Sequence, residues 1–183
     1  MTAAETVQER LEWLRRLRNP RRFRPDPISE PVLRDLLEVA RWSGSAKNVQ
    51  PWEFVVVRDR ATLTALAGLE GAVGHLANAA AAIVLVMEGD PERRVHETFD
   101  EGRLTERIML AASAHGLGSS IGWFVGQGQR DAKRLLGIPA ERHVLTALSL
   151  GYLDTGEQPT GVARGRKPLA ELVSYERYGE HAD

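Results

Sequence analysis

Two clusters of basic residues lie near the two ends of the sequence, each in a turn next to a predicted helix boundary. They are Arg18, Arg21 and Arg22 near the start, and Arg164, Arg166 and Lys167 near the end. The planar guanidinium group can donate two parallel hydrogen bonds to a phosphate, and clusters from distant segments can close on one phosphate group. The pattern therefore predicts a site for a small phosphorylated ligand. The alternative is a solvated charged surface.

A polar turn leads directly into an apolar strand over residues 43–57, which read SGSAKNVQPWEFVVV. The preceding helix is expected to end at Ser43-Gly44, and the residue before Pro51 is forced into an extended conformation. Such a turn exposes a group of polar side chains at the edge of the core, namely Ser45, Lys47, Asn48 and Gln50. This arrangement suits a polar, planar ligand. An ordinary connection whose polar residues bind their own backbone is the alternative.

The segment Gly118–Gly122 matches the nucleophile elbow of a hydrolase, with Ser120 as nucleophile. Aspartates follow at Asp131 and Asp154, and His181 comes last, in the order that a catalytic triad needs. An elbow lies between a strand and a following helix, whereas this segment follows a predicted helix and precedes a strand. A Ser120 hydrolase is therefore the less favoured alternative. The dinucleotide fingerprint also fails, because the glycines end a helix instead of opening one.

His96 and Asp100 are four residues apart on a predicted long helix, a spacing that allows a shared metal ion or hydrogen bond. No third ligand stands at a related spacing, so a solvated helix face is favoured and no metal site is predicted. The tryptophans Trp42, Trp52 and Trp123 are expected in the core or in a pocket wall.

Length and composition narrow the classes of function. The 183 residues fit a single domain, expected to span 1–183. The 24 basic residues balance 25 acidic ones, so net charge favours neither nucleic acid nor an anionic membrane. No cysteine is present, so redox chemistry would need a cofactor. The N-terminal stretch lacks an apolar signal core and the longest apolar run is too short to span a bilayer, which predicts a soluble cytoplasmic protein.

Hydrophobic periodicity predicts helices alternating with strands. Helices are expected over 6–18, from Ser29 to about residue 42, over 61–69, from Pro91 to His115, over 132–136 and after Pro168. Strands are expected over 52–57, 80–87, 116–125 (after an initial glycine turn) and 143–153. This order is compatible with an α/β protein and with a layered α+β domain.

Taken together, these segments resemble the flavin-dependent nitroreductase family over nearly the whole chain. The resemblance lies in the segments RNPRRF (18–23), SGSAKNVQPW (43–52), GLGS (116–119) and GRKPL (165–169). The Asn-x-Gln-Pro-Trp turn that enters an apolar strand is the most specific of them. The resemblance implies an α+β layered sandwich, with a central, mainly antiparallel sheet flanked by helices. It also implies a homodimer that holds FMN at its interface and passes a hydride from NAD(P)H to an acceptor.

Mapped by position, the resemblance implies a set of FMN-binding residues from four segments. They are Arg18, Asn19 and Arg21 in the first loop, Ser45, Ala46, Lys47 and Asn48 along the ribityl chain and ring, the backbone of Gly122 and Trp123 facing flavin N5, and Arg164 and Arg166 at the phosphate. No acid–base side chain is required beyond the flavin, because a backbone amide at N5 would orient hydride transfer. Arg21 or Lys47 would stabilise the negative charge that builds along N1 and O2 on reduction.

The sequence departs from the family pattern in three places. Asn19 stands where a serine is usual, and the segment from Gly71 to Asn78 lacks a lysine that some members use near the pyrimidine edge. The loop around Gly122 also looks one residue shorter than in many members, which shifts the N5-facing residue by up to one position.

The favoured hypothesis is an FMN-dependent, NAD(P)H-linked reductase of nitro, quinone or related small acceptors. A flavin-binding or sequestering protein without turnover is the alternative from another class. The sequence leaves open the electron acceptor, the choice between NADH and NADPH, and the choice between FMN and a deazaflavin.

Overall fold

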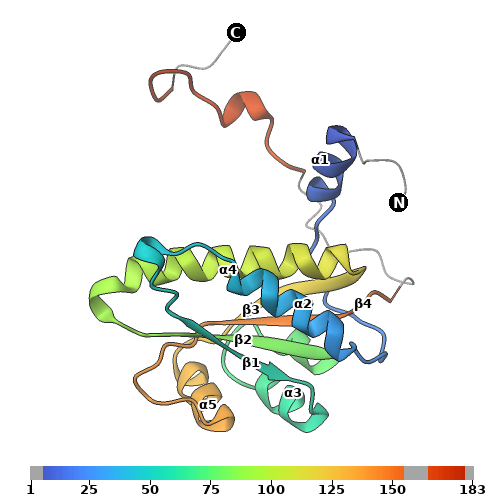
Figure 1. Cartoon of the computed structure of the whole chain (residues 1–183), viewed down its shortest axis with the longest axis vertical. Helices are drawn as coiled ribbons and strands as arrows, with labels where there is room; N and C mark the ends of the chain where they lie inside the picture. The colour runs from blue at the N-terminus through green and yellow to red at the C-terminus, as the bar shows by residue number, and fades with distance from the viewer. Residues whose placement is uncertain (1–5, 155–164, 180–183) are drawn as a thin grey trace.

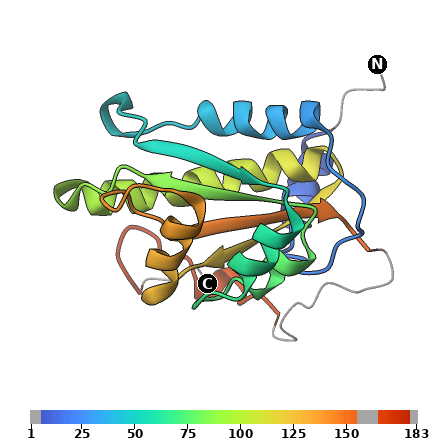
Figure 2. The same cartoon turned by 90° about the horizontal axis from the view of Figure 1, so that it is seen from below.

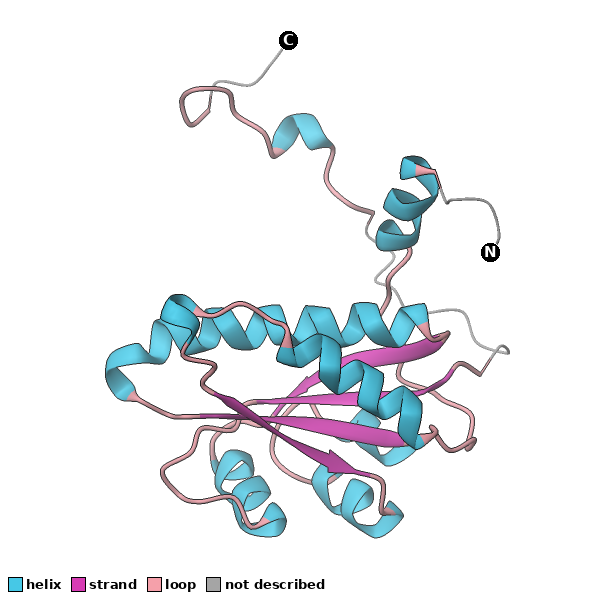
Figure 3. Ribbon diagram, in the orientation of Figure 1, coloured by secondary structure: helices cyan, strands magenta, loops and turns pink. Residues whose placement is uncertain are grey.

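The computed structural model describes residues 6–154 and 165–179 of the chain. Its centre is a sheet of four strands in the order β1-β2-β4-β3, and every neighbouring pair is antiparallel (Figures 1 and 3). The strands are β1 (Trp52–Val57), β2 (Ala81–Met87), β3 (Leu117–Trp123) and β4 (Thr146–Tyr152). The α+β class with an antiparallel sheet, predicted from the sequence, is confirmed.

Helices cover both faces of this sheet (Figures 1 and 3). On one face lie α2 (Glu30–Arg41) and the long α4 (Arg94–Ala114), which follows the 3₁₀ turn η3 (Pro91–Arg93). The other face is covered by α3 (Arg60–Ala67), α5 (Gln127–Leu136) and the 3₁₀ turn η2 (Gly74–Asn78). The strands are thus held between two helical layers.

The central strand β2 shows why this arrangement needs two hydrophobic clusters. All seven of its residues are buried. Because side chains alternate along a strand, Ile83 and Leu85 pack under α2 and α4, whereas Val84 and Val86 pack against the α3 side. A continuous apolar run is therefore the pattern expected of a strand covered on both faces.

Two segments project from the body on the same side in Figure 1. Helix α1 (Val7–Arg15) has a capping box between Thr6 and Glu9 but buries none of its residues. The C-terminal segment, here called the arm (residues 165–179), contains the 3₁₀ turn η4 (Leu169–Glu171) and is exposed along most of its length. Large apolar side chains are exposed on both segments, including Leu14, Leu169 and Tyr178.

The predicted elements are largely confirmed, with three differences. Helix α5 begins at Gln127 instead of Ala132, because the Glu70 carboxylate accepts the Gln127 N–H at 2.9 Å, a tertiary contact that periodicity does not reveal. The helix expected after Pro168 is one 3₁₀ turn, since it has little surface to pack on. The 3₁₀ turns η1 (Ala46–Asn48) and η2 were not predicted.

Two of the tryptophans do not lie in the core of the chain. Trp42 is 69% exposed and Trp123 is 52% exposed, whereas Trp52 is half-buried. The core alternative is therefore wrong for Trp42 and Trp123, and the alternative of a pocket wall stays a prediction for both. No helix in the described ranges is long and apolar enough to cross a membrane.

One carboxyl group is buried between α4 and the start of β4. Glu101 is 3% exposed, and its Oε1 accepts the Thr146 N–H at 3.2 Å. Burial raises the pKa of Glu101 above its ordinary value, and the hydrogen bond from Thr146 only partly opposes this. The folded chain therefore binds a proton at Glu101 more tightly than the unfolded chain does.

We expect Glu101→Gln to stabilise the protein at pH 8 and to lose that advantage at low pH. With a raised folded-state pKa, the wild type loses stability as the pH rises above about 4.5 and through the raised value. The glutamine retains an acceptor for Thr146 and does not ionise. Urea unfolding of both proteins at pH 4.5 and pH 8, at one protein concentration, measures the difference. A stability difference between the two proteins that does not change with pH would contradict the raised pKa of Glu101.

Candidate functional site

The segment Arg18–Arg24, here called the arginine turn, is fixed to one end of the sheet. The Asn19 side chain accepts the Ile121 N–H of β3 at 3.4 Å. Farther along, Arg24 N–H donates to Tyr152 O at 2.8 Å, and Phe23 forms a bridge with Leu153. The turn therefore lies across the ends of β3 and β4, and its position is set by strands.

Glycines in the sheet, which carry no side chain, allow the arginine turn to pack closely on the strands. A Cβ atom on Gly151 would lie 2.6 Å from Phe23 Cβ, and one on Gly118 would lie 2.7 Å from Pro20 Cγ. Real Cβ atoms do not come so close to other atoms. The 9% exposed Phe23 ring is thus seated on two glycines of paired strands.

The outer edge of β3 presents backbone groups next to the arginine turn, although residues 70–72 cover part of it, since Ala72 N–H donates to Trp123 O at 2.8 Å. Phe124 N–H donates to Leu145 O across the β3–β4 pair, and hydrogen-bonded residues alternate along an antiparallel ladder. Because of this alternation, the Gly122 N–H points toward β4, and the N–H groups of Ile121 and Trp123 point away from it. Of the two residues expected to offer a backbone amide to a ligand, only Trp123 presents its N–H at the edge.

The arginines of the turn differ in how their guanidinium groups are engaged. Arg18 donates to the carbonyl oxygens of Arg15 and Leu17 at the end of α1, so its head group caps that helix. Arg24 pairs with Asp26 at 3.3 Å. Within the described ranges Arg21 forms neither a hydrogen bond nor an ion pair. Arg21 is therefore the arginine best placed to hold an external anion.

His75 of η2 lies beneath the same part of β3. The ring is 8% exposed, and its Nδ1 lies 2.8 Å from Ser149 Oγ. Burial lowers the pKa of His75 below its ordinary value, and the nearby charge of Arg21 lowers it further. The sequence analysis did not single out His75, although it is the only titratable residue in the segment from Gly71 to Asn78.

The second predicted ligand segment, Ser45–Gln50, here called the polar loop, is held in an unusual conformation. Lys47, Asn48 and Gln50 all have positive φ values, of 55°, 55° and 54°, so the extended conformation expected of Gln50 before Pro51 is wrong. Ser45 Oγ accepts the Gln50 N–H at 2.9 Å, which closes the loop. The Ser45 hydroxyl therefore serves the loop itself, while the side chains of Lys47 and Asn48 remain exposed.

A single chain does not bring the polar loop and the arginine turn together. The polar loop enters β1 at Trp52, which pairs with Met87, whereas the turn is attached to β3 and to the far end of β4. Strands β1 and β3 are the two edges of the sheet, three strand spacings or roughly 14 Å apart. Figure 2 shows the two segments at opposite ends as well.

The late basic cluster is only partly described. Arg166 is exposed at the base of the arm, and Arg164 lies outside the described residues. The predicted closure of both basic clusters on one phosphate is therefore not seen within one chain.

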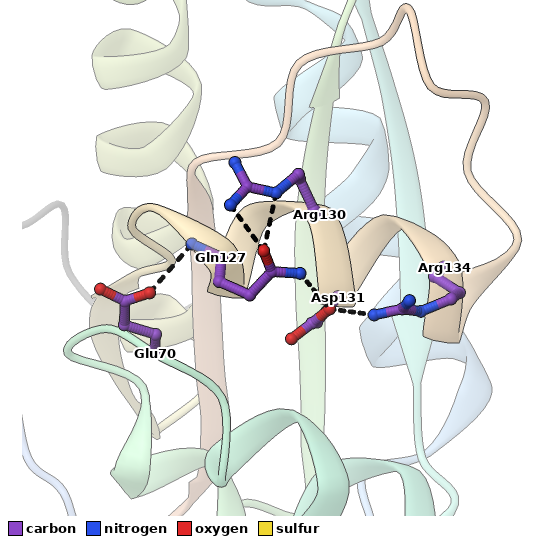
Figure 4. A network of polar contacts seen from close by, with 5 residues as sticks. All are labelled: Glu70, Gln127, Arg130, Asp131 and Arg134. Atoms are coloured by element: carbon purple, nitrogen blue, oxygen red, sulfur yellow. Dashed lines mark hydrogen bonds and ion pairs between the residues drawn. The ribbon is translucent and has the colours of Figure 1, made fainter.

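Polar side chains at the start of α5 form a network in which the charged groups already have partners (Figure 4). Glu70 accepts the Gln127 amide, Gln127 Oε1 accepts from Arg130 at 2.5 and 2.9 Å, and Arg134 pairs with Asp131. A carboxylate already lies at this helix N-terminus. The network therefore stabilises α5 and offers no anion site.

The hydrolase alternative does not fit the observed positions. Ser120 lies in the middle of β3 and is 1% exposed, so its hydroxyl cannot reach a substrate from solvent. His181 lies outside the described residues. His96 is exposed while Asp100 is 3% exposed, so the solvated face expected of this pair is wrong for Asp100. No group of three metal-ligating side chains occurs in the part of the chain that is described.

Comparison with known proteins gives a consistent result. Residues 14–152 match the nitroreductase family. An Archaeoglobus fulgidus protein, whose name combines NADH dehydrogenase with NAD(P)H nitroreductase, is 34% identical over 150 residues, which cover 80% of this chain and 86% of that protein. A Thermus thermophilus NADH dehydrogenase is 31% identical, covering 85% of this chain and 90% of its own.

Solved structures share the fold. An FMN-dependent nitroreductase from Clostridium difficile has a TM-score of 0.78 at 22% identity and covers 92% of this chain and 99% of its own. An NADPH:FMN oxidoreductase from Vibrio harveyi, complexed with NAD+, has a TM-score of 0.75 at 23% identity and covers 94% of this chain and 79% of its own.

We expect Gly122→Ala to destabilise the protein by about 1–3 kcal/mol, as overpacking typically does. The new Cβ would lie 2.8 Å from His75 Nε2 and 2.9 Å from Ala72 O, so η2 would have to move off β3. Gly74→Ala in η2 is the matched control, because its Cβ would meet nothing within 4 Å. Chemical denaturation measures the free energy of unfolding of both variants. Equal stability of the two variants would show that η2 does not pack on Gly122 in solution.

Proposed function

Because the chain belongs to the nitroreductase family, we propose that it is an FMN-dependent oxidoreductase. It transfers a hydride from NAD(P)H, by way of the flavin, to a nitro, quinone or related small acceptor. The observation that carries the proposal is the arginine turn, where Arg21 has no partner among the described residues and lies beside the outer edge of β3. The names of the two curated relatives support NAD(P)H-linked redox chemistry.

The residues present fit such a cofactor. Arg21 supplies a positive charge for an anionic group, and Asn19 holds the turn against β3. The outward amide of Trp123 is a donor on a rigid strand, which suits orientation of a planar ring. Arg166, with Arg164 outside the described residues, would bind phosphate. Bound FMN would supply the two-electron chemistry.

The separation of the two ligand segments supports a homodimer with FMN at its interface. The arginine turn and the polar loop lie at diagonal corners of the sheet, so one ligand can contact both only if a second copy supplies one of them. Exposed apolar side chains on α1 and on the arm provide surface for that second copy, among them Leu14, Leu169, Leu172 and Tyr175.

The first test is optical. Purified protein reconstituted with FMN is expected to be yellow, and to be bleached when NADH or NADPH is added without oxygen and recoloured by a quinone or nitro compound. Colour without bleaching would identify a flavin-sequestering protein instead. A protein that stays colourless after reconstitution would refute both. Mass spectrometry of the released ligand distinguishes FMN from a deazaflavin.

The shared site can be tested with mixed dimers of Arg21→Glu and Lys47→Glu chains. Each variant alone is expected to lose flavin, since losing a charge-assisted hydrogen bond costs about 1.5–3 kcal/mol. In a dimer of one chain of each kind, one site carries both changes and the other carries neither. Isolation through two different affinity tags should therefore yield one FMN per mixed dimer.

The matched control combines Arg21→Glu with Asn19→Asp, both on the arginine turn. Neither site of this mixed dimer is intact, so it is expected to bind no flavin. Absence of flavin from the first mixed dimer as well would show that the two segments do not share one ligand.

A further inference from the structure

One nitrogen of the His75 ring has a polar neighbour and the other has none. Nδ1 lies 2.8 Å from Ser149 Oγ, and this hydroxyl lies 3.4 Å from Ser120 O, to which it donates. Nε2 is buried and has no hydrogen-bond partner among the described residues.

The surroundings of the His75 ring partly favour its protonated form. A Cβ on Gly122 would lie 2.8 Å from Nε2 and 2.9 Å from Ala72 O, so the bare glycine leaves room for both groups against β3. The backbone of Ile121 and Ala72 favours the protonated ring, because carbonyl oxygens accept hydrogen bonds from it.

Two effects oppose protonation of the His75 ring. Burial penalises the charged ring, and the positive charge of Arg21 repels it. Strands β3 and β4 present only the hydroxyls of Ser120 and Ser149 on this side, and η2 has no other ionisable residue. Arg60 of α3 binds the carbonyl oxygens of Ala77 and Ala79 at the far end of η2.

We propose that His75 is a proton-binding member of the anion site around Arg21. When a negative charge is held beside Arg21, the neutral His75 ring takes a proton from solvent, and the proton leaves again with that charge. This inference rests on the proposed function, in which the charge comes from the phosphate of FMN or from the reduced ring. His75 acts through the charge at Arg21 and is a positioning residue.

The test follows the ring proton signals of His75 by NMR as a function of pH, with His75→Gln identifying the signals. The pKa is measured in ligand-free protein, with inorganic phosphate, with oxidised FMN, and after anaerobic reduction of bound FMN by dithionite. A nearby opposite charge typically shifts a pKa by about 1–3, so a rise of that size is expected in at least one state. A rise with phosphate and oxidised FMN identifies the phosphate as the source, and a rise only on reduction identifies the ring.

An unchanged pKa of His75 in every state of a yellow protein would overturn the inference and leave the proposed function intact. If the protein binds no FMN, the proposed function fails, but Arg21→Gln still tests the coupling without ligand. Removing this positive charge should raise the pKa of His75 toward its ordinary value, and no change would overturn the inference.

The matched control is His143→Gln. His143 is half-buried, and its pKa is lowered by burial and by Arg94, whose guanidinium lies 2.8 Å from its Nδ1. It lies before β4, at the opposite end of that strand from the arginine turn. This variant should leave the titration of His75 and its response to FMN unchanged.

Discussion

Close packing onto small residues of the β3–β4 pair is the constraint on which the candidate site depends. Gly118, Gly122 and Gly151 leave room for elements that larger side chains would exclude. Phe23 fills the space over Gly118 and Gly151, and His75 fills the space beside Gly122. Both contacts are buried, so the arginine turn and η2 are fixed relative to the strand edge. The precision of the site therefore comes from the sheet, with loops supplying only the charged groups.

This packing also brings the positively charged Arg21 close to backbone N–H groups of β3, and no negatively charged side chain among the described residues neutralises them. The outward amides of β3 and the guanidinium of Arg21 are donors, and no carboxylate among the described residues pairs with Arg21. An unpaired edge strand is normally protected from association with other chains. Here the arginine turn covers part of that edge through Asn19, which leaves the amide of Trp123 available. A concentration of donors at a partly open edge suits a ligand that is planar and anionic.

Most elements could be predicted from the sequence, because β2 is a continuous apolar run and α2 has a strong apolar face flanked by Ser29 and Gly44. The arginine turn and the polar loop were also recognisable from residue types. Their separation was not, since it depends on the strand order β1-β2-β4-β3, which pairs segments distant in sequence. The phase of the β3 ladder, which turns the Gly122 amide inward, likewise depends on its pairing with β4. His75 was missed because its role arises only from contact with Ser149 and Gly122.

The conformation of the polar loop adds an independent argument that two copies build one site. A left-handed conformation costs roughly 1–2 kcal/mol for an ordinary residue, and this loop contains Lys47, Asn48 and Gln50 in that region. Such strain persists where the surrounding structure imposes it and is frequent at ligand sites. Within its own chain the loop faces solvent, and the hydrogen bonds that close it come from the loop itself, among them Gln50 N–H to Ser45 Oγ and Asn48 N–H to Ser45 O. A strained, exposed loop of this kind supports the proposal that the loop contacts a ligand held mainly by a second chain.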